Sequence, residues 1–553
     1  MTPLYARHKR TTLAIATAVA AGALLATGMT TGASAEVAAA PTAKPTLPGA
    51  QIQLSAAERT SLIQEADAAT PQTAKEIGLG AKEKLVVRDV IQDADGTLHT
   101  RYERTYNGLP VLGGDLVVHE TAAGKTESVT KATKATIKVA SLTPTVTSAK
   151  AEKQALTAAK AAGSEKTTAD EAPRKVIWAA NGTPVLAYET VVGGLQDDGT
   201  PNELHVITDA ATGAKLYEYQ GIETGTGKSL YSGTVTLGTT LSGSTYQLTD
   251  TSRGSHKTYN KSHTTTSSAG TLFTDADDTW GTGAASSSTT DQTAAVDAAY
   301  GAQTTWDFYK NTFNRSGIKN NGVAAYSRVH YGNAYVNAFW DDSCFCMTYG
   351  DGSGNVKPLT SLDVAGHEMT HGVTSNTAGL NYSGESGGLN EATSDIFGTA
   401  VEFYAANSSD VGDYLIGEKI NINGNGTPLR YMDQPSKDGA SANYWSSTLK
   451  NLDVHYSSGP ANHFFYLLSE GSGAKTINGV SYNSPTSNGA TITGIGRAKA
   501  SQIWYKALTE YMTSTTTYAG ARTATLSATA ALYGSTSTEY ATVAATWTAV
   551  NVS

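Results

Sequence analysis

The segment from Leu362 to Phe403 constrains the fold and the chemistry of this 553-residue chain more than any other. Four apolar residues near its start, Leu362, Ala365, Met369 and Val373, follow one another at i, i+3, i+7 and i+11. In an α-helix this spacing places all four side chains on one stripe. The pattern therefore predicts a helix whose apolar side packs on a core.

Two histidines lie on another face of the same predicted helix. His367 and His371 are four residues apart, so their imidazoles are stacked one turn apart and can converge on one metal ion. Glu368 completes the pattern H-E-x-x-H, in which the glutamate serves as a base for metal-bound water. The alternative is a pair of histidines that only packs or faces solvent on an ordinary helix.

A second helical pair of polar residues follows downstream. Glu391 lies twenty residues after His371, and Asp395 follows it at i+4. His367, His371 and Glu391 would form a zinc site with three protein ligands and a fourth position open for water, the pattern of catalytic zinc. Asp395 is spaced to accept the other ring N–H of a ligand histidine, for which we expect His367. The alternative for Glu391 is a carboxylate favoured by the dipole at a helix start.

The blocks His367–Val373 and Asn390–Thr399 resemble the thermolysin family of secreted neutral zinc metalloproteases. The resemblance runs in order from about Gly225 to the C-terminus, and propeptide-like segments precede it. It implies a preproenzyme that hydrolyses peptide bonds with one catalytic zinc ion.

Composition and charge exclude several other classes of protein. Only 16% of the residues are charged and the net charge is −9, whereas a nucleic-acid partner would require a basic surface. Two cysteines in the whole chain do not make a disulfide scaffold. Beyond the N-terminus no apolar run reaches the roughly 18 residues typical of a membrane span, so we expect a mature form without membrane association. We also expect the mature form to be a monomer.

Residues 1–35 are predicted to be a secretory signal, which implies an extracellular enzyme. Basic residues precede the small-residue apolar segment Thr12–Gly28, and Ala33–Ala35 fits an A-x-A cleavage site before Glu36. A retained membrane anchor is the alternative.

Residues 36–222 are predicted to be a propeptide. After an Ala/Pro-rich linker at 36–50, a first module covers about 51–120 and a second covers 145–221. Both resemble propeptide modules of the family, which implies that they inhibit the enzyme and assist its folding. The alternative is a pair of binding domains retained in the mature protein.

Local patterns predict the elements of both modules. In the first module we expect a helix at Leu54–Ala68 and a strand at His99–Tyr106, followed by an Asn107-Gly108 hairpin turn. In the second we expect a helix at Ser148–Ala162 and then four strands: Lys175–Trp178, Pro184–Thr190, Leu204–Thr208 and Lys215–Gln220.

The remaining chain is predicted to be a two-lobed α+β catalytic domain. Its β-rich lobe, with the zinc helix, covers 223–372 and its helical lobe covers 373–553. Short strand-like runs and one helix, Thr293–Asn311, precede residue 350, and helical patterns dominate after Leu362. The zinc helix lies at the junction of the β-rich and helical lobes, where a cleft would form. Later helices are expected at Arg497–Met512, Ala519–Leu532 and Ser537–Val550.

The segment Gly225–Ser229 superficially resembles a phosphate-binding loop. The first glycine of that motif would fall at Ile222, and Leu230–Leu237 is predicted to be a strand rather than a helix. We therefore reject nucleotide binding and expect the mature enzyme to begin here.

The expected chemistry is hydrolysis by zinc-bound water, whose proton Glu368 takes and passes to the leaving amine. The resemblance implies that Tyr382 and His455 donate hydrogen bonds to the oxyanion; an ordinary packed aromatic and an ordinary loop histidine are the alternatives. In the family an aspartate five residues earlier orients this histidine. Position 450 is lysine here and the nearest acid is Asp453, so the orienting group stays open.

The resemblance also implies how substrate is bound. The segment Tyr335–Trp340 resembles an edge strand that pairs an extended peptide, with Asn337 and the carbonyl of Ala338 making the bonds. Arg430 would bind a carbonyl on the leaving-group side. An apolar pocket there implies cleavage on the N-terminal side of bulky apolar residues, and its predicted lining is Leu359, Val364 and Leu429.

Cys344 and Cys346 lie in what looks like a two-residue insertion relative to thermolysin. In an oxidising compartment we expect them to form a disulfide, although the ring would be tight. Free thiols and a metal site are the alternatives.

Acidic residues around the zinc helix predict at least one structural calcium ion. Four carboxylates suit a hard cation that takes six to eight oxygen ligands. The family has a bridging acid where this chain has Leu415, which implies one ion with the Leu415 carbonyl as a ligand. A weaker second candidate is Asp275–Asp278. The predicted carboxylate ligands are Asp363, Glu402, Asp413 and Glu418.

Other functions fit the sequence less well. A metzincin would need glycine and histidine where this chain has Thr374 and Thr377. An inactive binding protein predicts damage at Glu368 or at a zinc ligand, and all are intact. A structural wall protein predicts repeats or anchoring signals, which the sequence lacks.

Overall fold

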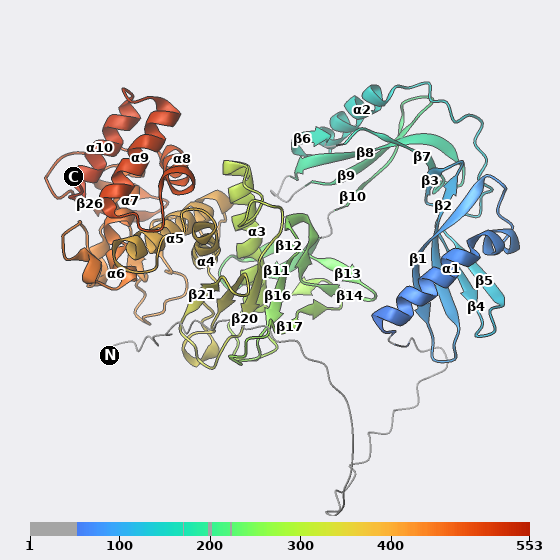
Figure 1. The fold of residues 1–553 in the computed structure, drawn as a ribbon, viewed down its shortest axis with the longest axis horizontal. Helices are drawn as coiled ribbons and strands as arrows, with labels where there is room; N and C mark the ends of the chain where they lie inside the picture. The colour runs from blue at the N-terminus through green and yellow to red at the C-terminus, as the bar shows by residue number, and fades with distance from the viewer. Residues whose placement is uncertain (1–51, 53, 170, 197–201, 222–223) are drawn as a thin grey trace, which may run out of the picture. The chain divides into compact units, whose positions relative to one another are not determined.

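The computed structural model describes residues 52, 54–169, 171–196, 202–221 and 224–553 (Figure 1). The predicted signal and linker, and residues 222 and 223 where the propeptide is expected to end, lie outside the described residues. Two compact units divide the chain: one takes most of the chain before Lys131, and the other takes Ala132–Ser553 with two short upstream segments.

The first unit packs helix α1 (Ala56–Glu76) on a small antiparallel sheet. Its N-terminus is fixed by a capping box in which Ser55 and Glu58 exchange hydrogen bonds. The predicted end at Ala68 is wrong: the helix continues because Ala74 and Ile77 pack on the core of the sheet. The strands here are β1 (Glu83–Gln92), β2 (Leu98–Tyr106), β4 (Leu116–Glu120) and β5 (Thr126–Lys131).

In the second unit, helix α2 (Ser148–Ala161) packs on a sheet and buries Ala151, Ala155 and Ala159. The predicted hairpin is confirmed, since Asn107 and Gly108 have positive φ and Tyr106 pairs with Leu109. All four predicted strands are present, and β6, which pairs with β8, is additional. The strands are β3 (Leu109–Leu112), β6 (Glu165–Ala169), β7 (Arg174–Trp178), β8 (Val185–Leu195), β9 (Leu204–Asp209) and β10 (Lys215–Gln220).

The β-rich part of the catalytic region begins with a hairpin. The predicted strand Leu230–Leu237 is wrong over its first four residues, because Ser229 binds the N–H groups of Tyr231 and Ser232 and closes a turn. The strands are β11 (Thr224–Lys228), β12 (Thr234–Gly238), β13 (Thr240–Ser242), β14 (Thr245–Gln247), β15 (Thr249–Asp250), β16 (His256–Asn260), β17 (Thr271–Leu272), β18 (Thr274–Asp275), β19 (Thr279–Trp280), β20 (Tyr326–Val329), β21 (Ala338–Asp341) and β22 (Cys346–Tyr349).

Strand β21 lies at the edge of the sheet ordered β15-β16-β20-β22-β21. The predicted strand start at Tyr335 is wrong by three residues. Ala334 has a positive φ and the Tyr335 carbonyl accepts from Gly352, so regular pairing with β22 begins at Ala338.

Helices dominate the rest of the chain, as expected, and α3 crosses the β-rich part (Figure 1). Two small hairpin-like pairs, β23–β24 (Leu415–Ile416 with Arg430–Tyr431) and β25–β26 (Gly473–Ile477 with Val480–Ser484), were not predicted. A π-helical segment, Ala507–Tyr511, extends α8. The helices are α3 (Thr293–Phe313), α4 (Leu362–Ser375), α5 (Gly384–Ala405), α6 (Val454–Ser457), α7 (Gly459–Glu470), α8 (Arg497–Lys506), α9 (Tyr518–Tyr533) and α10 (Thr538–Ala549).

The close contact between α4 and α5 positions the candidate site. The predicted apolar stripe of α4 is confirmed, since all four of its side chains are buried. Gly366 and Gly398 face each other, and a Cβ on Gly398 would collide with the carbonyl oxygen of Asp363. The absent side chains let the two helices approach, which brings the histidines of α4 to the carboxylates of α5. Within the described ranges, no helix is long and apolar enough to span a membrane.

Candidate metal centre

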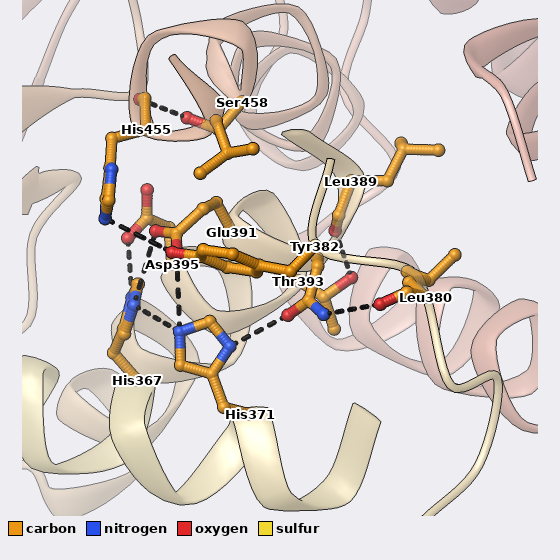
Figure 2. A network of polar contacts seen from close by, with 12 residues as sticks. His367, His371, Leu380, Tyr382, Leu389, Glu391, Thr393, Asp395, His455 and Ser458 are labelled. Carbon is orange, nitrogen blue, oxygen red and sulfur yellow. Dashed lines mark hydrogen bonds and ion pairs between the residues drawn. The ribbon is translucent and has the colours of Figure 1, made fainter. Parts of the chain in front are cut away.

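Three side chains from α4 and α5 converge on one point (Figure 2). The Nε2 atoms of His367 and His371 are 3.0 Å apart. Glu391 places its Oε2 3.5 Å from the first nitrogen and its Oε1 3.4 Å from the second. Ligand atoms around a tetrahedral zinc ion lie about 3.3 Å apart, given bonds of 2.0–2.1 Å.

Hydrogen bonds behind the two rings fix their tautomers. His367 Nδ1 lies 2.8 Å from Asp395 Oδ1, and His371 Nδ1 lies 2.8 Å from Asn390 Oδ1. The Asn390 amide donates to the Leu380 carbonyl, so its oxygen must face the histidine. Both Nδ1 atoms therefore carry the proton, and both Nε2 lone pairs point inward.

These donors fit a zinc ion. Two lone pairs 3.0 Å apart repel each other unless a cation lies between them. Glu391 is fully buried, and its Oε2 accepts no hydrogen bond from any described residue. Burial alone would raise the pKa of Glu391, but His455 and the two histidines of α4 hold it well below its usual value.

Behind the three side chains, Asp395 accepts hydrogen bonds from several residues at once. Arg430 donates to it twice, Nε to Oδ2 at 2.7 Å and a terminal nitrogen to Oδ1 at 2.6 Å. Asn462 adds a fourth donor at 2.8 Å. Although burial opposes ionisation, Arg430 and His367 lower the pKa of Asp395, so the group is a carboxylate. The structure thus places Arg430 beside the site, with two nitrogens of its guanidinium group hydrogen-bonded to Asp395.

Glu368 lies beside the ligands without being one of them. It is buried, and burial raises its pKa, while the neighbouring His367 and His371 partly offset that rise. A carboxylate in such surroundings is a stronger base than one in water.

Tyr382 and His455 also lie against Glu391, at the oxygen that faces His371 (Figure 2). The Tyr382 hydroxyl donates to Glu391 Oε1 and lies 3.3 Å from His455 Nε2. Asp453 caps α6, accepting from the His455 backbone N–H at 3.0 Å and facing Nδ1 at 2.7 Å. The orienting acid that the sequence left open is therefore Asp453, two residues before the histidine instead of five.

The residues expected to bind substrate occupy the edge of the sheet and the neighbouring core. Ala338 begins β21, and the carbonyl of Asn337 accepts a hydrogen bond from Gly350. Leu359 and Val364 are buried in the core, and Leu429 is half-buried.

The structure joins Cys344 and Cys346 in a disulfide. The bridge joins Cys344, in the turn after β21, to Cys346, the first residue of β22, so it constrains the turn next to the predicted substrate-binding edge.

A second group of acids lies where the start of α4 meets the last turn of α5. Carboxylate oxygens of Asp363, Glu402 and Glu418 all lie within 4.8 Å of one another. The Asp413 backbone N–H donates to Glu402, and Leu415 donates its own N–H to the Asp413 carboxylate. Burial and then the neighbouring Asp363 raise the pKa of Asp413 to about 7 and that of Glu418 to about 10.

Sequence reasoning missed a fifth member of this group, Asp410. Its side chain is buried, and burial together with Asp363 raises its pKa to about 7. Asp410 lies in an irregular loop, where only its position three residues before Asp413 could have indicated it. Each of Glu402, Asp410 and Glu418 keeps one buried oxygen without a partner among the described residues. We call Asp363, Glu402, Asp410, Asp413 and Glu418 the acid cluster.

Comparison with known proteins identifies the family. Residues 224–375 match the model for the thermolysin metallopeptidase catalytic domain, and residues 378–552 match the model for its alpha-helical domain. Residues 83–133 match the fungalysin/thermolysin propeptide motif.

Two relatives found by sequence agree with these matches. The transglutaminase-activating metalloprotease of Streptomyces mobaraensis is 63% identical over 98% of this chain and 72% of its own length. Thermolysin of Alicyclobacillus acidocaldarius subsp. acidocaldarius is 36% identical over 86% of this chain and 87% of its own. The solved precursor of protealysin from Serratia proteamaculans is 28% identical, covering 54% of this chain and 87% of its own, with a TM-score of 0.40. The chain belongs to the thermolysin family of zinc metalloendopeptidases and is made with a propeptide of that family.

Proposed function

We propose that His367, His371 and Glu391 hold the zinc ion of this endopeptidase and that Glu368 is its general base. The observation that carries this assignment is the pair of Nε2 lone pairs 3.0 Å apart beside the unpartnered oxygen of Glu391. Bound zinc polarises the scissile carbonyl and lowers the pKa of a water ligand. Side chains of the protein carry out the proton transfers, stabilise the oxyanion and bind the substrate.

Glu368 accepts the proton of the attacking water and delivers it to the nitrogen of the leaving amine. Its burial favours this role, because a carboxylate with a raised pKa holds the proton long enough to pass it on. Asp395 and Asn390 keep the ligand histidines in the required tautomer throughout.

Tyr382 and His455 donate hydrogen bonds to the negative oxygen that develops on the substrate carbonyl. Their polar atoms are 3.3 Å apart and both reach toward Glu391, which supports a shared target beside the metal centre. Asp453 is the positioning residue: it accepts the Nδ1–H of His455 and turns Nε2 toward the substrate. Burial lowers the pKa of His455, but Glu391 and Asp453 raise it above its usual value overall, so the ring can carry a second proton on Nε2 and donate a hydrogen bond to the oxyanion.

The substrate is an extended peptide that pairs with the β21 edge through Asn337 and Ala338. Arg430 binds a carbonyl on the leaving-group side, and Leu359, Val364 and Leu429 form the apolar pocket there. The enzyme therefore cleaves on the N-terminal side of bulky apolar residues. Sequencing of the peptides cut from a denatured protein tests this specificity, and an excess of acidic or small residues after the cut would refute it.

The proposed life cycle follows from the sequence. Residues 1–35 direct secretion and are removed, and residues 36–222 are cleaved off to leave a monomeric extracellular enzyme, with the domain limits given above. The propeptide inhibits the enzyme until export. The acid cluster binds at least one calcium ion that stabilises the mature form, with the Leu415 carbonyl as a further ligand.

The sequence identity of 63% to the transglutaminase-activating metalloprotease also favours a more specific natural substrate. Over 98% of the chain, 63% of residues are shared with a relative named for that activity. We propose that a secreted zymogen, such as a transglutaminase precursor, is a natural substrate, cut once in its exposed pro-segment. Incubation of the two purified proteins tests this, and degradation without release of active transglutaminase would refute it.

The Glu368→Gln variant tests the assignment of the base. The variant should keep one zinc ion at the centre, because His367, His371 and Glu391 are untouched, and lose a factor of at least about 100 in casein hydrolysis. Glu510→Gln, at an exposed helix position, is the matched control and should retain both. Activity of Glu368→Gln above about a hundredth of the parent value would show that the base is another group.

A further inference from the structure

A third group of potential metal ligands lies outside both the zinc centre and the acid cluster. Strands β16, β20 and β22 are neighbours and run parallel. His330 directly follows β20, Asp351 comes shortly after β22, and His263 comes shortly after β16. The carboxyl ends of adjacent parallel strands are a common place for ligand sites, because residues far apart in sequence meet there.

The three side chains are in direct contact. His263 Nε2 lies 2.8 Å from Asp351 Oδ2, and His330 Nδ1 lies 2.7 Å from the same oxygen. His330 and Asp351 are 1% and 2% exposed, respectively. Both histidines have a left-handed backbone, with φ of 59° and 56°, which is uncommon outside glycine, although asparagine, aspartate and histidine adopt it more often than other residues.

The hydrogen bond behind His330 decides what its other nitrogen can do. Nε2 lies 2.8 Å from the backbone carbonyl of Asp291, which can only accept, so Nε2 carries the proton. In the neutral ring, Nδ1 then turns a lone pair toward a carboxylate oxygen 2.7 Å away. Two acceptors so close require a positive charge. The other oxygen, Asp351 Oδ1, is buried and has no partner among the described residues.

We propose that His263, His330 and Asp351 bind a divalent transition metal of the zinc class, at a site separate from the catalytic centre. Two imidazoles and one carboxylate are a donor set that suits zinc and its neighbours. A cavity of about 10 Å³ lined by His330 and Asp351 adjoins the group, leaving room for about one water molecule as a fourth ligand. The N–O pairs would open by about half an ångström to the spacing that zinc requires, and Asp351 Oδ1 supplies a second donor oxygen.

The site would be structural, because its ligands tie three chain segments together. The His263 N–H donates to the His330 carbonyl, and the Asp351 carbonyl accepts from Lys357, five residues before α4 begins. Bound metal would therefore fasten the loop after β16 to the connection that leads into the zinc helix. The alternative source of positive charge is a second proton on His330, which would make a buried ion pair with Asp351 and leave no place for a metal.

Metal content separates the two explanations. The full chain is prepared in the Glu368→Gln background to prevent self-digestion, supplied with zinc, dialysed against metal-free buffer and analysed for all first-row transition metals. We expect two metal ions per chain. His263→Gln keeps an N–H donor toward Asp351 but removes a ligand, so it should retain one; His371→Ala should also retain one, and the double variant none.

One metal ion in the parent protein, together with none in His371→Ala, would overturn the second site and leave the zinc centre intact. Two ions in His263→Gln would overturn it as well, because its amide side chain should not hold the metal. If His263→Gln does not fold, the stoichiometry of the parent decides alone: one ion refutes the site, and two ions with one remaining in His371→Ala support it.

Discussion

Removal of calcium should destabilise the mature enzyme before it affects the chemistry. The acid cluster holds four buried carboxylates and the half-buried Glu418, and three of their oxygens have no partner within the described part of the chain. A cation that binds only the folded state stabilises it by about 2.7 kcal/mol at a hundredfold excess over its dissociation constant. For a domain of this size that free energy corresponds to roughly 5 °C in the unfolding midpoint.

The pKa values of the acid cluster give this effect a pH dependence. Without calcium, burial and like charges raise the pKa of Asp410 and Asp413 to about 7 and that of Glu418 to about 10. All exceed the value of about 4 in an unfolded chain, so between these limits the folded state binds more protons than the unfolded state. Calcium-free stability therefore falls as pH rises from about 4 through 7 and above. The calcium-dependent gain should be larger at about pH 8 than at about pH 5.

The assay is thermal unfolding of the zinc-loaded Glu368→Gln protein, with and without calcium at both pH values. Asp410→Asn removes one carboxylate, so it should raise the calcium-free midpoint and shrink the calcium-dependent gain. Glu510→Gln, at an exposed position, is the control and should behave as the parent. An equal gain in Asp410→Asn and the parent would exclude Asp410 as a ligand, and no gain in the parent would dispose of the calcium site.

The propeptide 36–222, added in trans, should inhibit the mature enzyme; no inhibition at micromolar concentration would leave it only a folding role. Asp453→Ala should lower kcat by about 10–100-fold with zinc content intact, and Asp453→Asn should restore much of it, whereas an unchanged kcat would show that Asp453 does not position His455. Gly398→Ala should lower stability by about 1–3 kcal/mol in denaturant unfolding, because its Cβ collides with the backbone of α4; a neutral effect would show that the helices can separate freely.

The convergence of His367, His371 and Glu391 could be predicted from the sequence because local helix geometry specifies most of it. His367 with His371, and Glu391 with Asp395, are i, i+4 pairs, so each pair shares a helix face whatever the rest of the fold does. Only the approach of α4 to α5 is non-local, and Gly366 and Gly398 permit it.

Features that depend on irregular backbone or distant contacts were not predictable in this way. Asp410 belongs to the acid cluster through a loop without periodicity, and Asp453 orients His455 only because it also caps α6. His263 and Asp351 are 88 residues apart in sequence and meet through parallel strand pairing, which no local pattern encodes. Residues 230–233 form a turn where a strand was predicted, because the side-chain oxygen of Ser229 accepts hydrogen bonds from the N–H groups of Tyr231 and Ser232.

The most direct test of the catalytic assignment is an anomalous difference map, recorded at the zinc edge from crystals of the zinc-loaded Glu368→Gln protein. We predict a peak about 2.0–2.1 Å from the Nε2 atoms of His367 and His371 and in contact with the Glu391 carboxylate, with the side chain at position 368 unbonded to the ion. A map without a peak at this point, or with the ion bonded to the side chain at 368, would contradict it.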